Sequence, residues 1–257
     1  LLSAHDFPYP KGEVFVSAKK ALRYGMQLGF PLVVKPAHSS LSRHVTINVQ
    51  SESELRVAIR IAKQVNYRIL VEQYIPGDVY RALILDGQWI ACAKREAGSV
   101  VGNGKDTIDK LIEEKNKHPL RGEPGSKNHT LFKIMKTRQL EKILVKQDVR
   151  LHTKLDKGKQ IFLSEKVNAG NGADITNVMQ CHPENMQMLI KVQQTLGLPL
   201  AAIDFICRDM TRPFYQQPFA LIENNSLPYI DMHHFPHSGP SVDVAKHIWD
   251  FVLSKLA

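Results

Sequence analysis

The sequence contains little cysteine and no long apolar run, and we expect no signal peptide in it. Its three cysteines lie far apart without CxxC spacing, which excludes a disulfide framework and favours reduced thiols in a cytoplasmic protein. Cys92 and Cys207 lie inside apolar runs, so we expect them in the core. No apolar run approaches the roughly 20 residues of a membrane span. The N-terminus lacks a basic region followed by an apolar stretch. We therefore expect no membrane partner.

The chain of 257 residues carries a net charge of +9. The basic residues are spread along it, and no basic ribbon interleaved with aromatic residues is present, so nucleic acid is not expected as the main partner. Small anionic ligands such as phosphates fit the charge as well. The chain does not begin with Met, and we expect residues 1–12 to be a linker from a missing upstream segment. Whether the chain forms a homo-oligomer stays open.

Apolar periodicity predicts short strands and amphipathic helices in a mixed α/β order. Neither a strand-to-helix GxGxxG unit nor a Walker sequence is present. Residues 117–130 and 228–240 are predicted to be loops. Strands are predicted over 13–16, 30–36, 45–49, 69–75, 80–86, 88–96, 161–163, 200–204 and 220–223, and helices over 18–28, 51–65, 108–116, 139–147, 183–196 and 242–256.

Two apolar runs near the C-terminal end each finish in oxygen-bearing side chains. The first ends in Asp204, and the second continues into Glu223 and Asn225. Glu223 and Asn225 are two residues apart, so they share one face of a strand. If the two strands are neighbours, the three side chains can meet. Two carboxylates and an amide are oxygen ligands that suit Mg²⁺. The alternative is an ordinary polar strand end.

Two further strands end in groups that suit a nucleotide. Lys35 ends an apolar run and precedes the hydroxyl-rich loop 37–44, which is typical of a phosphate contact. The strand around Glu72 ends in Gln73-Tyr74-Ile75, which can present backbone groups to an adenine ring. The alternatives are a lysine that reaches solvent and an edge strand that runs into a Pro-Gly turn.

Arginines and histidines complete the list of candidate residues. Arg81 and Arg95 lie on the two arms of a predicted hairpin, and arginine suits bidentate phosphate or carboxylate contacts. His233, His234 and His237 lie in a loop with Asp231, but their spacing is not a standard zinc pattern. A substrate-facing role for Tyr229, His233 or Ser238 stays open.

In this order the motifs resemble the ATP-grasp superfamily of carboxylate–amine ligases, over about residues 10–253. The likeness is greatest to the ATP-grasp domains of cyanophycin synthetases and of bifunctional glutamate–cysteine ligase/glutathione synthetases. Its most specific parts are Val-Val-Gly-Asn-Gly-Lys-Asp-Thr-Ile at residues 100–108 and the stretch from Asn168 through Asp174-Ile-Thr to His182-Pro-Glu-Asn.

The resemblance implies an α+β ATP-grasp fold, in which two α/β lobes with antiparallel sheets clasp a nucleotide. Residues 13–76 would form the small lobe, and residues 77–257 the large lobe with the metal site. The cofactors would be ATP and two Mg²⁺ ions, with Mn²⁺ as an alternative. The reaction would join a carboxylate of an amino acid or peptide to an amine through an acylphosphate and release ADP.

The resemblance also assigns roles to residues. Lys35 would hold the α- and β-phosphates, and Arg81 and Arg95 would face phosphate or the acylphosphate, so these three are the catalytic candidates. The other assigned residues would be Glu72, Gln73, Tyr74, Ile75 and Asp78 for the nucleotide, and Asp204, Glu223 and Asn225 for the metal.

The chain also departs from this family. Loop 37–44 has no glycine, Val79 stands where the family has an acidic residue, and Ser164 replaces an arginine. Two hypotheses follow, an active ligase or a catalytically impaired ATP-binding regulatory or scaffold module. The substrates are not named by the sequence. We expect their specificity to lie in 117–130, 164–180 and 228–240.

Overall fold

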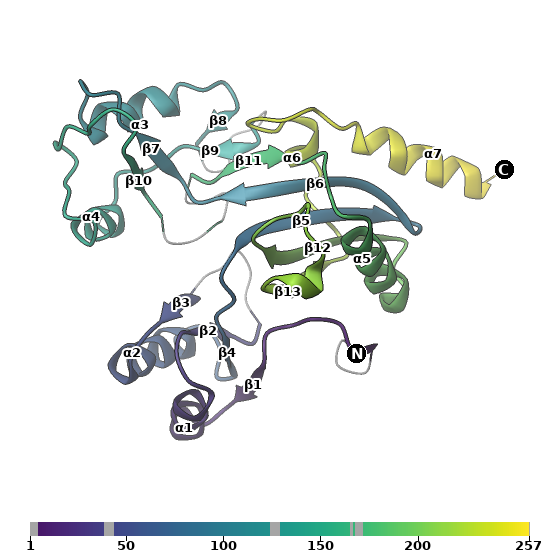
Figure 1. Cartoon of the computed structure of the whole chain (residues 1–257), viewed down its shortest axis with the longest axis horizontal. Coiled ribbons are helices and arrows are strands. Elements are labelled where there is room, and N and C mark those ends of the chain that lie inside the picture. The colour runs from purple at the N-terminus through teal and green to yellow at the C-terminus, as the bar shows by residue number, and fades with distance from the viewer. Residues whose placement is uncertain (1–4, 39–43, 124–128, 165–166, 168–171, 257) are drawn as a thin grey trace. The chain divides into compact units, whose positions relative to one another are not determined.

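A computed structural model of the chain divides into two compact units (Figure 1). It describes residues 5–38, 44–123, 129–164, 167 and 172–256. The smaller unit is built mainly from Leu1–Gly77. The larger unit is built mainly from Asp78–Phe205 and Glu223–Ala257, while the end of one of its strands and the start of the next are grouped with the smaller unit.

The smaller unit is a four-stranded antiparallel sheet with two helices that contact it and each other (Figure 1). Its strands lie in the order β1-β4-β2-β3. Every element lies within two residues of its predicted bounds. The elements are β1 (Gly12–Phe15), α1 (Ala18–Leu28), β2 (Leu32–Pro36), β3 (Thr46–Val49), α2 (Glu52–Lys63) and β4 (Ile69–Gln73).

Both helices of the smaller unit begin at a serine that caps them. The Ser17 hydroxyl accepts a hydrogen bond from the Lys20 amide. The Ser51 hydroxyl accepts one from the Glu54 amide, and the Glu54 carboxylate in turn accepts the Gln50 amide at 2.8 Å. These bonds satisfy N–H groups that the first helical turn leaves without partners, which explains why the helices begin where the sequence predicts.

The core of the smaller unit lies between the helices and the sheet. The predicted apolar stripe of α2, which includes Leu55 and Ala62, is fully buried against Leu32 and Val71 of the sheet. Burial of such side chains contributes about 25 cal/mol for each Å² removed from water. This packing fixes β2 and β4 beside each other.

The larger unit contains a five-stranded sheet in the order β11-β6-β5-β12-β13. β5 and β6 form the predicted hairpin, which turns at Asp86 and Gly87 with φ angles of 47° and 76°. The strands are β5 (Asp78–Leu85), β6 (Gln88–Glu96), β11 (Asp174–Asn177), β12 (Leu200–Cys207) and β13 (Phe219–Asn225).

The prediction that a strand ends at Asp204 is wrong. β12 continues to Cys207, and both Phe205 and Cys207 are fully buried. The apolar positions beyond Asp204 keep the strand in the sheet, and the buried charge of Asp204 is met by cations within the same sheet. β12 and β13 are neighbours, as the predicted metal site requires.

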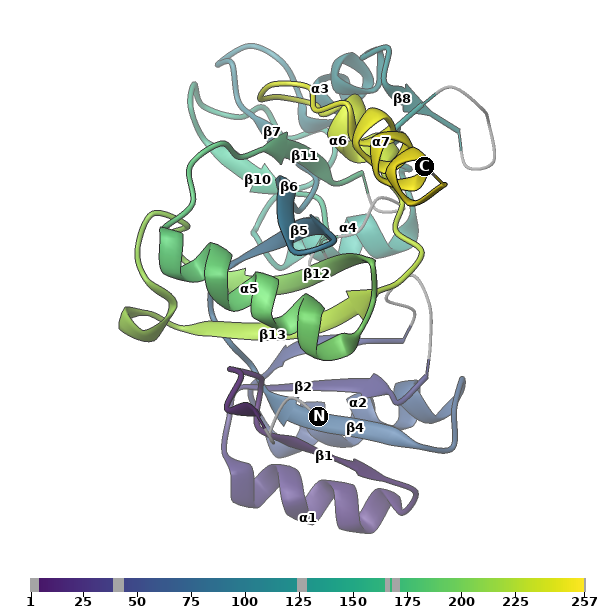
Figure 2. The same cartoon turned by 90° about the vertical axis from the view of Figure 1, so that its right-hand side faces the viewer.

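Helices cover both faces of this sheet. On one face, Met232 of α6 packs with Ala93 and Ile175, and Val244 of α7 packs with Leu83. Figure 2 shows α5 on the other side of the sheet from α7. The prediction of an irregular loop over 228–240 is wrong where α6 forms. These helices are α5 (Pro183–Leu196), α6 (Asp231–His234) and α7 (Val244–Leu256).

The rest of the larger unit forms a second core around α3 and α4. The prediction of a loop over 117–130 is wrong where β8 forms, which pairs in parallel with β9 and includes the buried Arg121. Cys92 and Cys207 are buried as predicted, and all three cysteines are free. The elements are β7 (Ser99–Val101), α3 (Ile108–Asn116), β8 (Arg121–Gly122), β9 (Leu131–Phe132), α4 (Arg138–Val145) and β10 (Gln160–Phe162).

Within the described ranges, no helix combines the length and apolar character needed to cross a membrane.

Candidate functional site

In the smaller unit, Lys35 lies on β2 beside Glu72 of β4. Val33 is opposite Glu72 in the antiparallel register, so Lys35 and Glu72 share a face of the sheet. The Lys35 Nζ lies 2.6 Å from Glu72 Oε1, and the lysine side chain is 25% exposed while the glutamate side chain is 9% exposed. The structure thus brings together two predicted nucleotide residues from different strands, and the lysine keeps access to solvent.

The predicted adenine segment follows directly on β4. The Gln73 amide donates to the Lys11 carbonyl at 2.9 Å, and the Tyr74 amide donates to the Pro31 carbonyl at 3.1 Å. Tyr74 and Ile75 are half-buried. Two backbone donors of this segment are therefore already used within the smaller unit, and their bonds hold the segment in a defined extended path after the strand.

Asp78 lies at the start of β5 in the larger unit. Its carboxylate lies 3.0 Å from Lys94 Nζ, and the same ammonium lies 3.1 Å from Glu96. Burial lowers the pKa of Lys94, but the hydrogen bonds and charges of Asp78 and Glu96 outweigh it and leave the pKa raised. Asp78 is thus paired with a cation, but it is half exposed and accessible to a polar ligand.

The most tightly bonded predicted residues are Asp204, Arg81 and Arg95 of the larger unit. The carboxylate of Asp204 accepts two bonds from Arg81, Nε to Oδ1 at 2.6 Å and Nη2 to Oδ2 at 2.8 Å. Arg95 Nη1 donates to Oδ2 at 2.9 Å. The Asp204 side chain is only 3% exposed. Three strands, β5, β6 and β12, therefore bring one carboxylate and two guanidiniums together on one sheet face.

The charges of this cluster are coupled to Glu223 on β13. Burial lowers the pKa of Arg81, but bonds and charge from Asp204, with the charge of Glu223, outweigh burial and raise it. Burial, opposed by Asp204 and reinforced by the neighbouring Arg81, leaves the pKa of Arg95 lowered. Both guanidiniums stay charged near neutral pH. Two cations face two carboxylates, so the cluster is electrically balanced as it stands.

The predicted metal ligands fit a hard cation by their chemistry. Asp204 and Glu223 supply carboxylate oxygens, and Asn225 supplies an amide. The Asn225 Nδ2 and Asn224 Oδ1 atoms are buried and have no hydrogen-bond partner among the described residues. Turning the Asn225 amide over would place its oxygen at the unpaired position. Within the described ranges, no three His, Cys, Asp or Glu side chains are arranged to hold a metal, so any ion here depends on the amide.

The three histidines of the segment 228–240 do not lie together as one set of ligands. His233 is fully buried, and its Nδ1 lies 3.3 Å from Asn177 Oδ1. His234 Nε2 accepts the amide of Ala245 at 3.0 Å. The ring of His237 lies 5.1 Å from that of His118. Each ring contacts a different element.

Tyr229 and Ser238 of the same segment have partners in the larger unit. The Tyr229 hydroxyl donates to the His129 carbonyl at 3.4 Å, and the hydroxyls of Ser238 and Thr176 lie 2.7 Å apart. Burial and the carboxylate of Asp231 raise the pKa of Tyr229. These contacts tie the segment to its neighbours.

The Gly-rich segment 102–105 is held by hydrogen bonds within the segment and to its neighbours. The Asn103 side chain accepts the amides of Lys105 and Asp106 at 3.0 and 2.9 Å and donates to the Asp106 carboxylate. A Cβ at Gly102 would lie 2.2 Å from the Asp156 carbonyl oxygen. The glycine therefore permits a close backbone approach, and the loop closes on itself.

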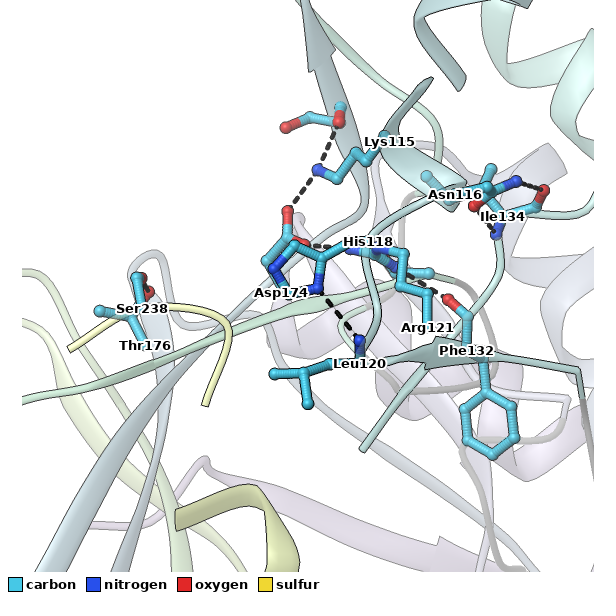
Figure 3. Close-up of polar contacts among 12 residues, drawn as sticks. Lys115, Asn116, His118, Leu120, Arg121, Phe132, Ile134, Asp174, Thr176 and Ser238 are labelled. Carbon is cyan, nitrogen blue, oxygen red and sulfur yellow. Dashed lines mark hydrogen bonds and ion pairs between the residues drawn. The ribbon is translucent and has the colours of Figure 1, made fainter. Parts of the chain in front are cut away.

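The sequence did not indicate a second charged cluster, which Figure 3 shows around Asp174. Asp174 lies 2.5 Å from Lys115 Nζ and is bonded to Arg121, whose side chain is fully buried. Arg121 also donates to the Phe132 carbonyl at 2.8 Å. A lone arginine in a polar stretch gives no sign of burial, so the sequence carried no signal for this cluster beyond the Asp174 motif itself.

Two departures from the family pattern, the glycine-free loop 37–44 and Ser164, bear on the site. Loop 37–44 is described only at residues 37, 38 and 44, and the stretch from Asn168 to Asn171 also lies outside the described residues. Ser164 is buried. Arg95 Nη2 donates to the Val167 carbonyl at 3.1 Å, so this arginine bonds both Asp204 and the chain just beyond Ser164.

Comparison with known proteins gives a consistent set of similarities. Residues 10–172 match the family described as D-ala D-ala ligase C-terminus. A cyanophycin synthetase of Trichormus variabilis is 32% identical over 256 residues, which cover 98% of this chain and 28% of that protein. The glutathione biosynthesis bifunctional protein GshAB of Streptococcus mutans serotype c is 31% identical over 93% of this chain and 32% of its own length.

A solved structure is similar to this chain over almost its whole length. The crystal structure of a bifunctional glutathione synthetase from Pasteurella multocida matches 99% of this chain and 35% of its own, with a TM-score of 0.71 and 25% identity. The chain thus spans only about a third of the length of each of these proteins.

Proposed function

Because the chain belongs to the D-ala D-ala ligase C-terminus family of ATP-grasp ligases, we propose that it catalyses ATP- and Mg²⁺-dependent formation of an amide or peptide bond. A substrate carboxylate oxygen would attack the γ-phosphorus of ATP and release ADP. An amine would then attack the acyl carbon of the acylphosphate, and inorganic phosphate would leave with the C–O bond electrons. No enzyme nucleophile is required, because the phosphate activates the acyl group.

The buried cluster of Asp204, Arg81 and Arg95 beside Glu223 is the observation that carries this proposal. Guanidiniums on a sheet face offer bidentate bonds to phosphate oxygens, and the nearby carboxylates offer ligands to a cation. Phosphoryl transfer depends mainly on positioning and on neutralising negative charge, which such a set supplies.

The individual residues would have the following roles within each unit. In the smaller unit, Lys35 would bind the α- and β-phosphates, and the segment Glu72–Ile75 would receive the adenine. In the larger unit, Asp78 would lie toward the ribose, and Arg81 and Arg95 would bind the transferring phosphoryl group.

Asp204, Glu223 and Asn225 would hold the metal. Two Mg²⁺ ions held there would neutralise phosphate charge, and Mn²⁺ would serve as an alternative. The unpaired amide atom of Asn225 supports this assignment, because a buried polar atom without a partner costs free energy unless a ligand satisfies it.

The substrates would be an amino acid or peptide carboxylate and an amine. The names of the relatives support this class, since they are synthetases of cyanophycin and of glutathione. The chain covers about a third of those proteins, so the activity proposed belongs to the region that it spans.

One observation favours a second function, a catalytically impaired ATP-binding module. Asp204 already accepts three hydrogen bonds from two arginines. If these bonds persist when nucleotide binds, the carboxylate is not released to a metal, and the chain would bind ATP without turning it over.

A phosphate-release assay distinguishes the two functions. The chain is incubated with ATP, Mg²⁺ and a panel of amino acids and dipeptides, and we expect phosphate only when an acid and an amine are both present. ATP binding by calorimetry without phosphate release over the whole panel would favour the impaired module.

A matched pair of variants tests the nucleotide site. We expect Lys35→Met to weaken kcat/KM by about 10²-fold, because a phosphate loses its cation. Lys63→Met removes the same charge from an exposed position at the end of α2 and should leave kcat/KM within about twofold.

A further inference from the structure

His233 is a fully buried histidine that none of the roles above uses. It lies on α6, next to Met232, which packs against Ala93 and Ile175 of the sheet. Ala93 is directly opposite Arg81 in the register of β5 and β6. The histidine therefore lies over the same sheet face as the arginine cluster, and the charge of Arg81 acts on it.

The side chain of Asn177 fixes which ring nitrogen of His233 carries the proton. Its Nδ2 donates to the carbonyls of His233 and Pro240, at 2.7 and 2.9 Å, so the orientation of the amide is determined. The Asn177 Oδ1 atom therefore faces His233 Nδ1 at 3.3 Å and must accept a hydrogen bond. It follows that Nδ1 is protonated and that Nε2 of the neutral ring carries a lone pair.

The Nε2 atom of His233 is buried and has no hydrogen-bond partner among the described residues. Burial, the charge of Arg81 and the charge of His234 lower the pKa of His233 to about 4, so the ring is neutral at physiological pH. A buried acceptor without a donor costs about 1–3 kcal/mol. Such an atom is stabilised if a donor reaches it in another state of the protein.

Building on the proposed function, we propose that His233 Nε2 is the alternative hydrogen-bond acceptor for Arg81, used when a metal ion engages Asp204. In this structure, Arg81 donates hydrogen bonds to Asp204 through Nε and Nη2. A cation on Asp204 competes for the same oxygens, and the guanidinium then needs another acceptor on the same sheet face. His233 Nε2 can be this acceptor. Because the ring is neutral, a hydrogen bond to it leaves the positive charge of Arg81 uncompensated, and that charge can still attract phosphate. His233 is thus a positioning residue.

Nitrogen NMR of histidine-labelled protein tests the tautomer and the exchange directly. The chain has eleven histidines, and the His233 signals are assigned by their loss in His233→Gln. In the wild type we expect a protonated Nδ1 and a bare Nε2. In Asp204→Ala, Arg81 is released, and the Nε2 resonance should move toward that of a hydrogen-bonded acceptor. A protonated Nε2 in the wild type, or an unmoved resonance in folded Asp204→Ala, overturns the proposal.

The same measurement on the wild type with Mg²⁺ and ADP covers the case in which Asp204→Ala does not fold. We expect the same movement of Nε2, and an unmoved signal in protein that has bound ADP overturns the proposal. If the wild type binds no ADP, the proposed function fails, and the spectrum of folded Asp204→Ala or Asp204→Asn decides the role of His233. An Asp204→Ala, Arg81→Met double variant is the control, because it lacks the donor. In the double variant, Nε2 should stay bare.

Two substitutions separate the Nε2 role from simple packing. Gln places its terminal amide near the position of Nε2, whereas Asn places it near Nδ1, beside Asn177. We expect His233→Asn to lower kcat about tenfold with KM for ATP within about twofold, as for one lost hydrogen bond. His233→Gln should keep kcat within about threefold. Equal losses in both variants, or a loss confined to KM, contradict the proposal.

Discussion

Two aspartates of the larger unit, Asp174 and Asp204, are each buried between two cationic side chains, yet their surroundings differ. The cations at Asp174 also bond main-chain carbonyls: Lys115 donates to Ser99 at 2.7 Å, and Arg121 donates to Phe132. The Arg121 side chain is fully buried. This cluster joins α3, β8 and β11 and bonds the main chain of two further strands, so it serves as a structural clamp.

The cluster at Asp204 differs in the exposure of its arginines and in its bonding partners. Arg81 and Arg95 are 12% and 15% exposed, and among the described residues Arg81 bonds only Asp204. Unpaired buried atoms of Asn225 and His233 lie in the same unit, and Glu223 adds an exposed carboxylate. A buried carboxylate between two cations is therefore not a functional signature by itself. The Asp174 cluster also contains an unpaired buried atom, Arg121 Nε, so unpaired atoms alone do not separate the clusters either. What separates them is that both arginines at Asp204 keep some exposure and act beside the exposed Glu223, whereas Arg121 is fully buried.

The largest expected difference between the two clusters is in activity. Asp204→Asn removes a metal ligand and the partner of both arginines, and we expect kcat to fall about 10³-fold. Asp174→Asn should leave kcat of the folded fraction within about threefold, because this cluster touches no reacting group. Phosphate release at matched concentrations of folded protein measures both. Similar losses in the two variants would mean that the clusters do not differ in function.

The second difference is in stability. Asp174→Asn leaves Lys115 and the fully buried Arg121 without their carboxylate, and we expect the free energy of unfolding to fall by about 3 kcal/mol. Urea denaturation measures it. Asp109→Asn is the control, because Asp109 pairs with Lys136 at the surface and should change stability by less than about 1 kcal/mol. If Asp174→Asn is no less stable than Asp109→Asn, the clamp assignment is wrong.

The third effect concerns pH and His233, the histidine beside the Asp204 cluster, and its full size is reached only near pH 4. The pKa of His233 is lowered to about 4 from 6.5. Between these values the unfolded chain binds the proton and the folded chain does not, so stability falls as pH drops from 6.5 toward 4. The loss reaches at most about 3 kcal/mol, since one pKa unit is 1.36 kcal/mol.

Denaturation midpoints between pH 7 and 4 measure this effect as a slope. The slope should be shallower in His233→Gln, where the titrating group is gone, than in the wild type. His247→Gln, at an exposed position of α7, should keep the wild-type slope. A slope that is the same in all three proteins would show that His233 titrates at its ordinary pKa.

Much of the fold follows from local patterns that the sequence shows directly. The six elements of the smaller unit were predicted within two residues, because serine caps, apolar stripes and strand runs all agree there. The predicted ATP-grasp relationship is confirmed by the family match and the similar structures. The roles of Lys35, Arg81, Arg95 and the metal ligands stay predictions.

The strands β7, β9 and β11 were also not predicted, but three other misses have a common physical cause. β12 runs past Asp204, β8 forms in a predicted loop, and α6 forms within 228–240. In each place a polar residue, Asp204, Arg121 or His233, is buried because partners distant in the sequence satisfy its charge or hydrogen bonds. Local polarity predicts a surface position for such residues, and only contacts across the chain reverse it.

By itself, the sequence determined the residue types at each strand end, the order of most helices and strands, and the family to which they belong. The tertiary structure decided which charges meet. It paired Asp204 with Arg81 and Arg95, enclosed Asp174 between Lys115 and Arg121, and left one nitrogen of His233 without a donor. The reason is that the free energy of a buried charge depends on the few ångströms around it, and residues far apart in the chain supply those neighbours.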